Sequence, residues 1–444
     1  MPDGVMLAME MGTGKTKVTI DLMANHDLKK VLIICPLSVV GVWPREFRTH
    51  AGVGYNVVPL NEGSVEKRTK IAQACVELAR RKNEAIALVI NYESAASGAF
   101  AKWSLAQSWD LIVLDESHKI KAPGGKRSMH FSHLGKRAKR RLCLTGTPMP
   151  HSPLDIYAQF RFLDASIFGT SFVQFRNRYA NMGGYGGYQI VSYKNISELH
   201  RKMYSRAFRV TKDVLDLPPY HHIDRTFVLG DEASRFYGTL EDKMYAELDD
   251  GEITVSNALV RLLRLQQVTS GYIMDDAGNT RHVDSAKIDM LADVLEDIDP
   301  SEPVVIFARF KEDLERIKKL VEKREKKDGK MCRYGEVSGD RKDLDEGRFP
   351  ENIDVLGVQI QSGGVGIDLT RAHFAIYYSL GFSLGDYEQS MSRVHRPGQT
   401  EPTTFIHLLA RKTVDEKVYK ALRKRKQVVE YVLSEGRYEE EEVA

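Results

Sequence analysis

The stretch VMLAMEMGTGKTKVTIDLMA (5–24) joins an apolar run, a glycine-containing turn and a helical pattern. Its two turn glycines let successive N–H groups face an anion, and the N-terminus of the following helix adds favourable partial charge. Lys15 is suited to the β- and γ-phosphates of a nucleotide, and Thr16 offers a hydroxyl to Mg²⁺. Met9 stands where the strict pattern has its first glycine. The stretch predicts a buried strand, a helix and, between them, a phosphate loop made of Gly12, Thr13, Gly14, Lys15 and Thr16.

A second candidate site begins where another apolar run ends. Leu111–Leu114 is followed directly by Asp115-Glu116-Ser117-His118. Parallel α/β sheets bind ligands at the carboxyl ends of their strands, so two carboxylates stand where a ligand is expected. We expect Asp115 to hold Mg²⁺ and Glu116 to polarise the attacking water. The spacing of roughly 100 residues from the phosphate loop fits a single domain.

A third motif lies near the other end of the chain, where residues 389–399 read QSMSRVHRPGQ. Two arginines, Arg393 and Arg396, flank His395 and can neutralise the charge that develops as a terminal phosphate leaves. The phosphate loop and the arginine motif would then belong to one active site, although they lie at opposite ends of the chain. This arrangement predicts two domains that close on ATP.

Composition sets limits on the class of protein. The 444 residues are enough for two or three domains with full cores. The four cysteines lack CxxC spacing, which argues against a zinc ribbon or disulfide framework and favours a reducing compartment. Apolar runs are far shorter than the ~20 residues that span a membrane, and no signal peptide is visible. We expect no membrane association, and a location in the cytoplasm of a bacterial or phage-infected cell, or in a nucleus.

Apolar runs fall into two groups, which predicts two sheets. The first ~160 residues alternate strand-like runs with helical stretches, as in a parallel sheet. The second group begins near residue 304, and the residues between are richer in helical periodicity. We therefore predict an α/β fold with two parallel-sheet lobes and a mostly helical insertion between them. The expected divisions are 1–163 (first lobe), 164–285 (insertion and linker), 286–432 (second lobe) and 433–444 (acidic tail).

Eight motifs in order resemble those of superfamily-two helicases. The first lobe carries MEMGTGKT, ICPLSVVGVWPREF (34–47), INYES (90–94), LDESH (114–118) and LTGTP (144–148), and the second carries VVIFARF, SGGVGIDLTRA (362–372) and QSMSRVHRPGQT (389–400). Trp43 and Glu46, the RVHRPGQ ending and TKDVLDLPP (211–219) make the chain similar to the Swi/Snf family of ATP-dependent double-stranded DNA translocases. The resemblance implies two RecA-like lobes, ATP with Mg²⁺, and duplex DNA as the partner.

The resemblance also implies roles for individual residues. Arg393 and Arg396 would be arginine fingers, and Gln389 would sense the nucleotide or position the water. Gly366 would belong to a backbone platform facing the nucleotide, while His395 would be structural. DNA phosphates would be met by hydroxyls and helix N-termini. The positions expected to do so are Ser38, Tyr92, Thr145 and Ser362.

The chain departs from the family pattern in several places. It begins shortly before the phosphate loop, so the upstream element that reads adenine is not seen, and we expect weak discrimination among nucleotides. Asp368 replaces the usual asparagine, and residues 148–157 lack the asparagine-rich stretch expected there. Large remodeller insertions are missing as well. A minimal motor of phage or bacterial type, acting as a monomer with or without a targeting protein, fits these features.

Other function classes stay open from the sequence. A strand-separating or fork-remodelling helicase would share all eight motifs, and only a separating element would distinguish it; no β-hairpin pin or winged helix is evident. A DNA-binding scaffold gated by nucleotide is a further alternative, although it would not need Lys15, Asp115, Glu116, Arg393 and Arg396 together. A small-molecule kinase is disfavoured, since no acceptor site or lid is discernible.

Overall fold

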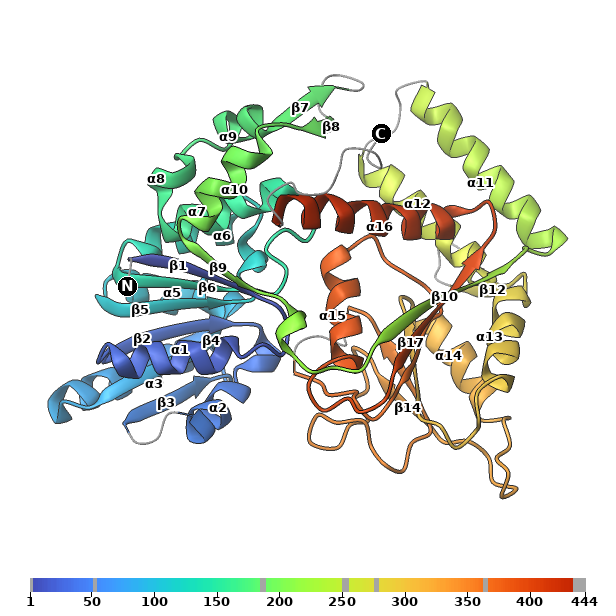
Figure 1. Cartoon of the computed structure of the whole chain (residues 1–444), viewed down its shortest axis with the longest axis horizontal. Coiled ribbons are helices and arrows are strands. Elements are labelled where there is room, and N and C mark those ends of the chain that lie inside the picture. Colours follow the sequence, from blue (N-terminus) through green and yellow to red (C-terminus); the bar gives the residue numbers. More distant parts are fainter. Residues whose placement is uncertain are drawn as a thin grey trace. The chain divides into compact units, whose positions relative to one another are not determined.

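The computed structural model describes residues 3–50, 54–183, 189–249, 255–274, 279–361 and 366–433, with side chains throughout these ranges except at 243–259. The chain divides into two compact units (Figure 1). Unit 1 comprises Met1–Leu215 and Arg425–Ala444, and unit 2 comprises Asp216–Lys424. No helix among the described residues combines the length and the apolar character that crossing a bilayer requires.

Unit 1 is built on a seven-stranded sheet in which all pairings are parallel, in the order β3-β4-β2-β5-β6-β1-β9. Its strands are β1 (Gly4–Met9), β2 (Lys30–Cys35), β3 (Tyr55–Leu60), β4 (Ala85–Asn91), β5 (Trp109–Asp115), β6 (Ala138–Leu144) and β9 (Ala207–Val210). The helices are α1 (Lys15–Asn25), α2 (Val42–His50), α3 (Val65–Lys82), α4 (Tyr92–Ala95), α5 (Gly98–Leu105), α6 (Lys126–Gly135), α7 (Ile156–Leu163), α8 (Ala165–Phe168), α9 (Phe172–Tyr179) and α10 (Ile196–Tyr204). A hairpin of β7 (Ala180–Gly183) and β8 (Gln189–Tyr193) completes the unit.

Unit 2 holds a six-stranded sheet, again parallel throughout, in the order β10-β17-β16-β13-β15-β14. Its strands are β10 (Tyr220–Phe227), β13 (Val304–Ala308), β14 (Tyr334–Val337), β15 (Val355–Gln359), β16 (Phe374–Tyr377) and β17 (Thr403–Ala410), with a separate pair β11 (Tyr272–Met274) and β12 (Thr280–His282). The helices are α11 (Asp231–Asp249), α12 (Val255–Thr269), α13 (Ala286–Glu296), α14 (Lys311–Val321), α15 (Leu384–Val394) and α16 (Val414–Leu433), the last of which ends in unit 1.

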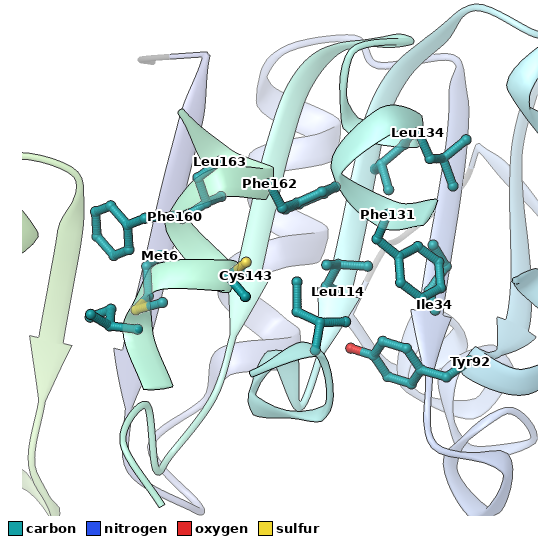
Figure 2. Close-up of a cluster of buried hydrophobic side chains, with 14 of the residues drawn as sticks. Met6, Ile34, Tyr92, Leu114, Phe131, Leu134, Cys143, Phe160, Phe162 and Leu163 are labelled. Atoms are coloured by element: carbon teal, nitrogen blue, oxygen red, sulfur yellow. The ribbon is translucent and has the colours of Figure 1, made fainter. Parts of the chain in front are cut away.

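The central strands of unit 1 are apolar along their length because helices cover the sheet. Figure 2 shows this packing: Ile34 and Leu114 from strands β2 and β5 face Phe131 and Leu134 of α6. Phe162 of α7 lies in the same cluster. This close packing fixes the carboxyl ends of β1 and β5, where the phosphate loop and the two carboxylates emerge.

The predicted α/β fold with two parallel-sheet lobes is confirmed. The division of the chain differs from the expected boundaries at 163 and 285. Residues 164–215 belong to unit 1, where β9 pairs with β1, and unit 2 already begins at Asp216, since β10 pairs with β17. Both strands lie at sheet edges, and most of β10 is exposed, so neither carries the continuous apolar run that marks a buried strand. Of the expected acidic tail, 434–444 lies outside the described residues.

Candidate active site

The phosphate loop has the backbone that its glycines permit. Gly12 and Gly14 have φ of 86° and 92°, a left-handed conformation that strains any residue with a Cβ. Gly14 is the N-cap of α1, and no side-chain capping bond is formed at this helix start by the residues that the structure describes. The first N–H groups of α1 are therefore not used by a side-chain cap and suit an anion such as a phosphate.

Lys15 lies against the end of strand β1. Its Nζ donates hydrogen bonds to the carbonyls of Met9 at 2.8 Å and Glu10 at 3.1 Å. The loop is closed by the Thr13 hydroxyl, which donates to the same Glu10 carbonyl at 2.7 Å. Phosphate oxygens are stronger partners for an ammonium than neutral carbonyls are, so a bound nucleotide would compete with these two contacts for the Lys15 side chain.

Asp115 ends strand β5 as a buried carboxylate, 9% exposed. Burial, and then the charge of Glu116, raise its pKa to about 7, while Lys15 opposes this shift. Two aromatic side chains hold the residue: Trp43 Nε1 donates to Asp115 Oδ2 at 3.2 Å, and the Tyr92 hydroxyl donates to the Asp115 carbonyl at 2.8 Å. A carboxylate that is costly to ionise and held from two sides is suited to a cation.

Glu116 turns the chain sharply, with a φ of 53° for a residue that has a Cβ. Such a conformation costs free energy and is often found where function requires it. The side chain is 5% exposed, and among the described residues none donates a hydrogen bond to its Oε2, although His118 Nδ1 lies 3.3 Å away. A buried carboxylate oxygen without a hydrogen-bond donor is an acceptor held ready for one, such as a water.

The turn after β6 is tied to this acidic segment. Thr145 Oγ1 lies 3.2 Å from His118 Nδ1 and accepts a hydrogen bond from the Thr147 amide at 3.1 Å. The Ser117 hydroxyl donates to Gln159 Oε1 at 2.7 Å, and Gln159 in turn donates to the Pro148 carbonyl at 2.7 Å. The LTGTP and LDESH segments therefore form one hydrogen-bonded assembly inside unit 1.

The residues present fit a magnesium nucleotide. Mg²⁺ prefers hard oxygen ligands and uses one or two carboxylates together with phosphates and water. Asp115 and the hydroxyl of Thr16, at the start of α1, would supply such ligands. The Glu116 oxygen that lacks a donor stands next in the chain, as a base or orienting group for water should.

In unit 2, α15 carries the arginine motif. Arg393, in its last turn, is buried at 8% exposed, and its carbonyl accepts from the Leu369 amide at 3.0 Å. Arg396 is partly exposed and makes one long hydrogen bond, of 3.5 Å, to the Ile367 carbonyl. Gln389 is partly exposed on the same helix. Gly366 is exposed with a φ of 104°.

Other residues of this motif support the fold of unit 2. His395 Nε2 lies 2.7 Å from the Pro218 carbonyl, and its ring packs edge-on against Tyr220 at 5.0 Å. Gln399 donates from Nε2 to three carbonyls, those of Thr370, Ala372 and Val394. These contacts agree with the expected structural role of His395.

Asp368 accepts hydrogen bonds at Oδ1 from the amide and the hydroxyl of Thr370, at 3.1 and 2.8 Å. An asparagine carbonyl oxygen can accept the same two bonds. The departure from the family pattern at this position therefore leaves the local turn intact.

Comparison with known families identifies the chain. The model of the SNF2-related domain matches residues 1–271, which is more than half of the sequence, and the model of the helicase conserved C-terminal domain matches residues 286–398. The chain belongs to the SNF2-related family.

Two relatives of this SNF2-related chain differ in the share of their own length that it covers. It is 25% identical over 435 residues to the Caenorhabditis elegans homologue of SWI/SNF-related matrix-associated actin-dependent regulator of chromatin subfamily A-like protein 1, covering 96% of this chain but 59% of the relative. It is 25% identical over 439 residues to protein p41 of Acyrthosiphon pisum secondary endosymbiont phage 1, covering 92% of this chain and 89% of that protein. The chain thus spans less than two thirds of the chromatin regulator and most of the phage protein.

Among solved structures, the SWI2/SNF2 ATPase core of Sulfolobus solfataricus in complex with double-stranded DNA is 24% identical, with a TM-score of 0.42 over 98% of this chain and 89% of that one.

The residues expected to meet DNA in this SNF2-related chain differ in accessibility. Ser38 is exposed within a 3₁₀ turn, Leu37–Val39. Tyr92 and Thr145 are 1% and 0% exposed, and both hydroxyls are used inside unit 1, by the Asp115 carbonyl and by His118 with Thr147. These two side chains do not reach a surface on which a phosphate could bind. Ser362 lies outside the described residues.

The contacts that hold the site are not visible in the sequence. Trp43 served only to indicate the family, but its indole holds Asp115. Glu10 accepts a hydrogen bond from the Lys212 amide at 3.1 Å, which ties the TKDVLDLPP stretch to the phosphate loop. No local signal reveals such pairs, since each joins residues 72 or 202 positions apart.

Proposed function

We propose that this SNF2-related chain is a DNA-dependent ATPase that couples ATP hydrolysis to translocation on, or remodelling of, double-stranded DNA. The observation that carries the proposal is the group of residues in unit 1. It combines a phosphate loop whose lysine lies at the end of β1, a buried carboxylate, and a neighbouring glutamate oxygen that accepts no hydrogen bond from the described residues. Such a set suits phosphoryl transfer to water, in which positioning and charge stabilisation do most of the work.

Each residue has a proposed task. Lys15, with the amides at the start of α1, would bind the β- and γ-phosphates, and Thr16 and Asp115 would hold Mg²⁺, which neutralises charge on the phosphates when bound. Glu116 would orient the attacking water and accept its proton. Lys15 would leave its two carbonyl partners for the stronger charge-assisted bonds to phosphate.

In unit 2, Arg393 and Arg396 would stabilise the charge on the transferring phosphoryl group, with Gln389 sensing the nucleotide and Gly366 presenting backbone to it. Arg396 is the better candidate for a finger because it is partly exposed and its guanidinium makes one long hydrogen bond within the described residues. Every group in this scheme comes from one chain, which supports a monomer as the active form.

Duplex DNA is the proposed partner. Membership in the SNF2-related family supports it, as does the worm relative, which is named as a homologue of a regulator of chromatin. The near-neutral net charge of +3 suits a motor that must release and rebind its track, because phosphate contacts bind strongly and depend steeply on salt. Ser38 is the exposed candidate for a phosphate contact at the start of the segment that leads into α2.

ATP hydrolysis should be measured without nucleic acid and with duplex DNA, single-stranded DNA or RNA. Selective stimulation by duplex supports the translocase. Stimulation mainly by single strands, together with release of a labelled strand, would favour a strand-separating helicase instead. Nucleotide-dependent DNA binding without any turnover would leave a nucleotide-gated scaffold.

A further inference from the structure

Positive charge is unevenly distributed in unit 1. Residues 117–154 carry nine basic and no acidic residues, and a second segment that follows them in the chain also has an excess of basic residues. This second segment comprises residues 165–183 and 189–210, and we call it the basic arm. It contains a single acidic residue, Glu198, and seven basic ones: Arg176, Arg178, Lys194, Arg201, Lys202, Arg206 and Arg209. The whole chain has 64 basic and 61 acidic residues, so 57 basic and 60 acidic residues lie outside the arm. The arm therefore carries a net charge of +6, whereas the rest of the chain carries −3.

The basic arm is anchored firmly on unit 1. Phe168 packs edge-on against Phe160 of α7 at 5.0 Å between ring centroids, and Phe175 lies 5.0 Å from Tyr157 of the same helix. Tyr179 extends the aromatic cluster, with its ring 4.9 Å from that of Phe175. Such packing fixes the surface charges of the arm relative to sheet β3-β4-β2-β5-β6-β1-β9, so their positions are part of the fold.

The single acid of the arm neutralises only part of this charge. Glu198 accepts from Arg178 at 2.5 Å and lies 3.2 Å from Lys202. Arg206 lies 3.7 Å from Asp164, just before the arm. By contrast, the side chains of two exposed residues, Lys194 and Arg201, make no ion pair or hydrogen bond within the part of the chain that the structure describes.

Lys194 directly follows strand β8 of the hairpin. In Figure 1 the β7–β8 hairpin extends beyond α9, on the side away from the sheet of unit 1. The described residues of β8 are exposed over most of their length, and Val191 is 68% exposed. The backbone amide of Lys194 donates to the Tyr179 carbonyl at 3.0 Å, which holds the base of the hairpin to the end of α9.

We infer that the basic arm is a second contact surface for the sugar–phosphate backbone of duplex DNA, with Lys194 and Arg201 as its leading phosphate contacts. The inference rests on the proposed function, because duplex DNA is the partner named there. An excess of one sign of charge, with one acid among eight charged residues, matches a polyanion. A protein partner fits less well, because the centres of protein interfaces are depleted in charged residues.

A surface of this kind would add affinity without reading sequence. It would also explain how a chain with little net charge can hold DNA during a hydrolysis cycle, since the local potential of the arm exceeds that of the whole chain. Neither Lys194 nor Arg201 belongs to the hydrolytic group, so their loss should leave the chemistry intact.

The test replaces Lys194 and Arg201 together by alanine in the full chain. The matched control replaces Lys70 and Lys102, which are exposed on α3 and α5 of the same unit and remove the same charge. Duplex affinity is measured by fluorescence anisotropy over a series of salt concentrations. Loss of two phosphate contacts should lower the slope of log affinity against log salt by about 1.8 and weaken binding several-fold at low salt, while hydrolysis without DNA stays the same.

The two possible failures are distinguishable. A wild-type chain that neither binds duplex nor is stimulated by it would remove the proposed function. A wild-type chain that does both, with the arm variant matching the Lys70 and Lys102 control in slope and affinity, would overturn the arm alone. If the arm binds an acidic protein instead of DNA, the arm variant should likewise match the control in duplex binding.

Discussion

The indole Nε1 of Trp43 donates a 3.2 Å hydrogen bond to Oδ2 of Asp115 in the interior of unit 1. Trp43 is 1% exposed and belongs to α2, a helix that begins shortly after the exposed turn carrying Ser38. The segment expected to meet DNA and the carboxylate expected to hold Mg²⁺ are thus joined through one short helix. Trp43 is therefore one path by which a contact at this turn would reach Asp115.

Replacing Trp43 by phenylalanine keeps a large aromatic ring and removes the N–H donor. We expect the Mg²⁺ concentration for half-maximal ATP hydrolysis to rise on the order of 10-fold, as for lost hydrogen bonds to metal ligands. Maximal hydrolysis at saturating Mg²⁺ should fall much less. The measurement is a Mg²⁺ titration of the hydrolysis rate at fixed ATP, with nucleotide binding followed separately.

Trp103→Phe is the control, because Trp103 packs against Trp109 and Phe100 away from the carboxylates. A Mg²⁺ dependence that is equal in both variants would show that the Trp43 bond does not orient Asp115.

Glu116→Gln removes the base while keeping the shape of the side chain. An amide cannot accept a proton from water, so we expect a loss of about 10²–10⁴-fold in the maximal rate. ATP should still bind, because Lys15, Thr16 and Asp115 are unchanged. Fluorescent-nucleotide binding and steady-state hydrolysis are compared with an exposed glutamate variant, Glu84→Gln. Turnover within a few-fold of the wild type would remove Glu116 from the mechanism.

The parts of the site that sequence predicted are those whose chemistry is local. A phosphate loop lies in consecutive residues, and Asp115 and Glu116 follow one apolar run, so both could be read directly. Tyr92 and Thr145 were expected to meet DNA, but a motif does not reveal which way a hydroxyl points, and both are turned inward to hold neighbouring segments.

The prediction of the strands from sequence was limited in the same way. Strands inside the sheets carry apolar runs, whereas the edge strands β9 and β10 are partly or mostly exposed and were missed. The β7–β8 hairpin was not expected either, because its strands are short and β8 is exposed. What holds an edge strand is backbone pairing to a distant partner, which leaves little trace in side-chain pattern.

Asp313 in unit 2 provides a test by pH. It is fully buried, its Oδ2 accepts from the Ser379 hydroxyl at 2.5 Å, and burial raises its pKa to about 6. An acid whose pKa is higher in the folded than in the unfolded chain binds more protons when folded. Stability is therefore lost as pH rises from about 4, the unfolded value, through about 6.

Asp313→Asn lacks this proton linkage. The measurement is hydrogen exchange of β13 and α14, corrected for the intrinsic pH dependence of exchange. As pH rises from 4 to 7, the free energy of unfolding of the variant should increase relative to that of the wild type by on the order of 2–3 kcal/mol. Asp340→Asn, which alters an exposed carboxylate of the same unit, should show no comparable trend. A difference between Asp313→Asn and wild type that is constant with pH would contradict the raised pKa.

Arg396 tests whether the second unit takes part in hydrolysis. If its guanidinium meets the transferring phosphoryl group only when DNA is bound, Arg396→Ala should bind ATP and DNA nearly as the wild type does. Its low rate of hydrolysis without DNA should hardly change, whereas the stimulation of that rate by duplex should disappear. The expected loss in the duplex-stimulated rate is up to about 10³–10⁵-fold, the contribution of an arginine finger. Lysine should not restore the rate, because an ammonium lacks the planar fork of donors.

The rate of ATP hydrolysis is measured against duplex concentration for wild type, Arg396→Ala, Arg396→Lys and the control Arg411→Ala. Arg411 is a suitable control because its guanidinium bonds to the Thr226 hydroxyl at the surface of the same unit, away from α15. The long bond of Arg396 to the Ile367 carbonyl contributes little stability, so its loss should not unfold the unit. An Arg396→Ala protein that keeps most of its duplex-stimulated rate would show that the residue only supports the loop after α15. In that case the charge on the leaving phosphate must be met by Arg393 or by Lys15 and Mg²⁺ alone.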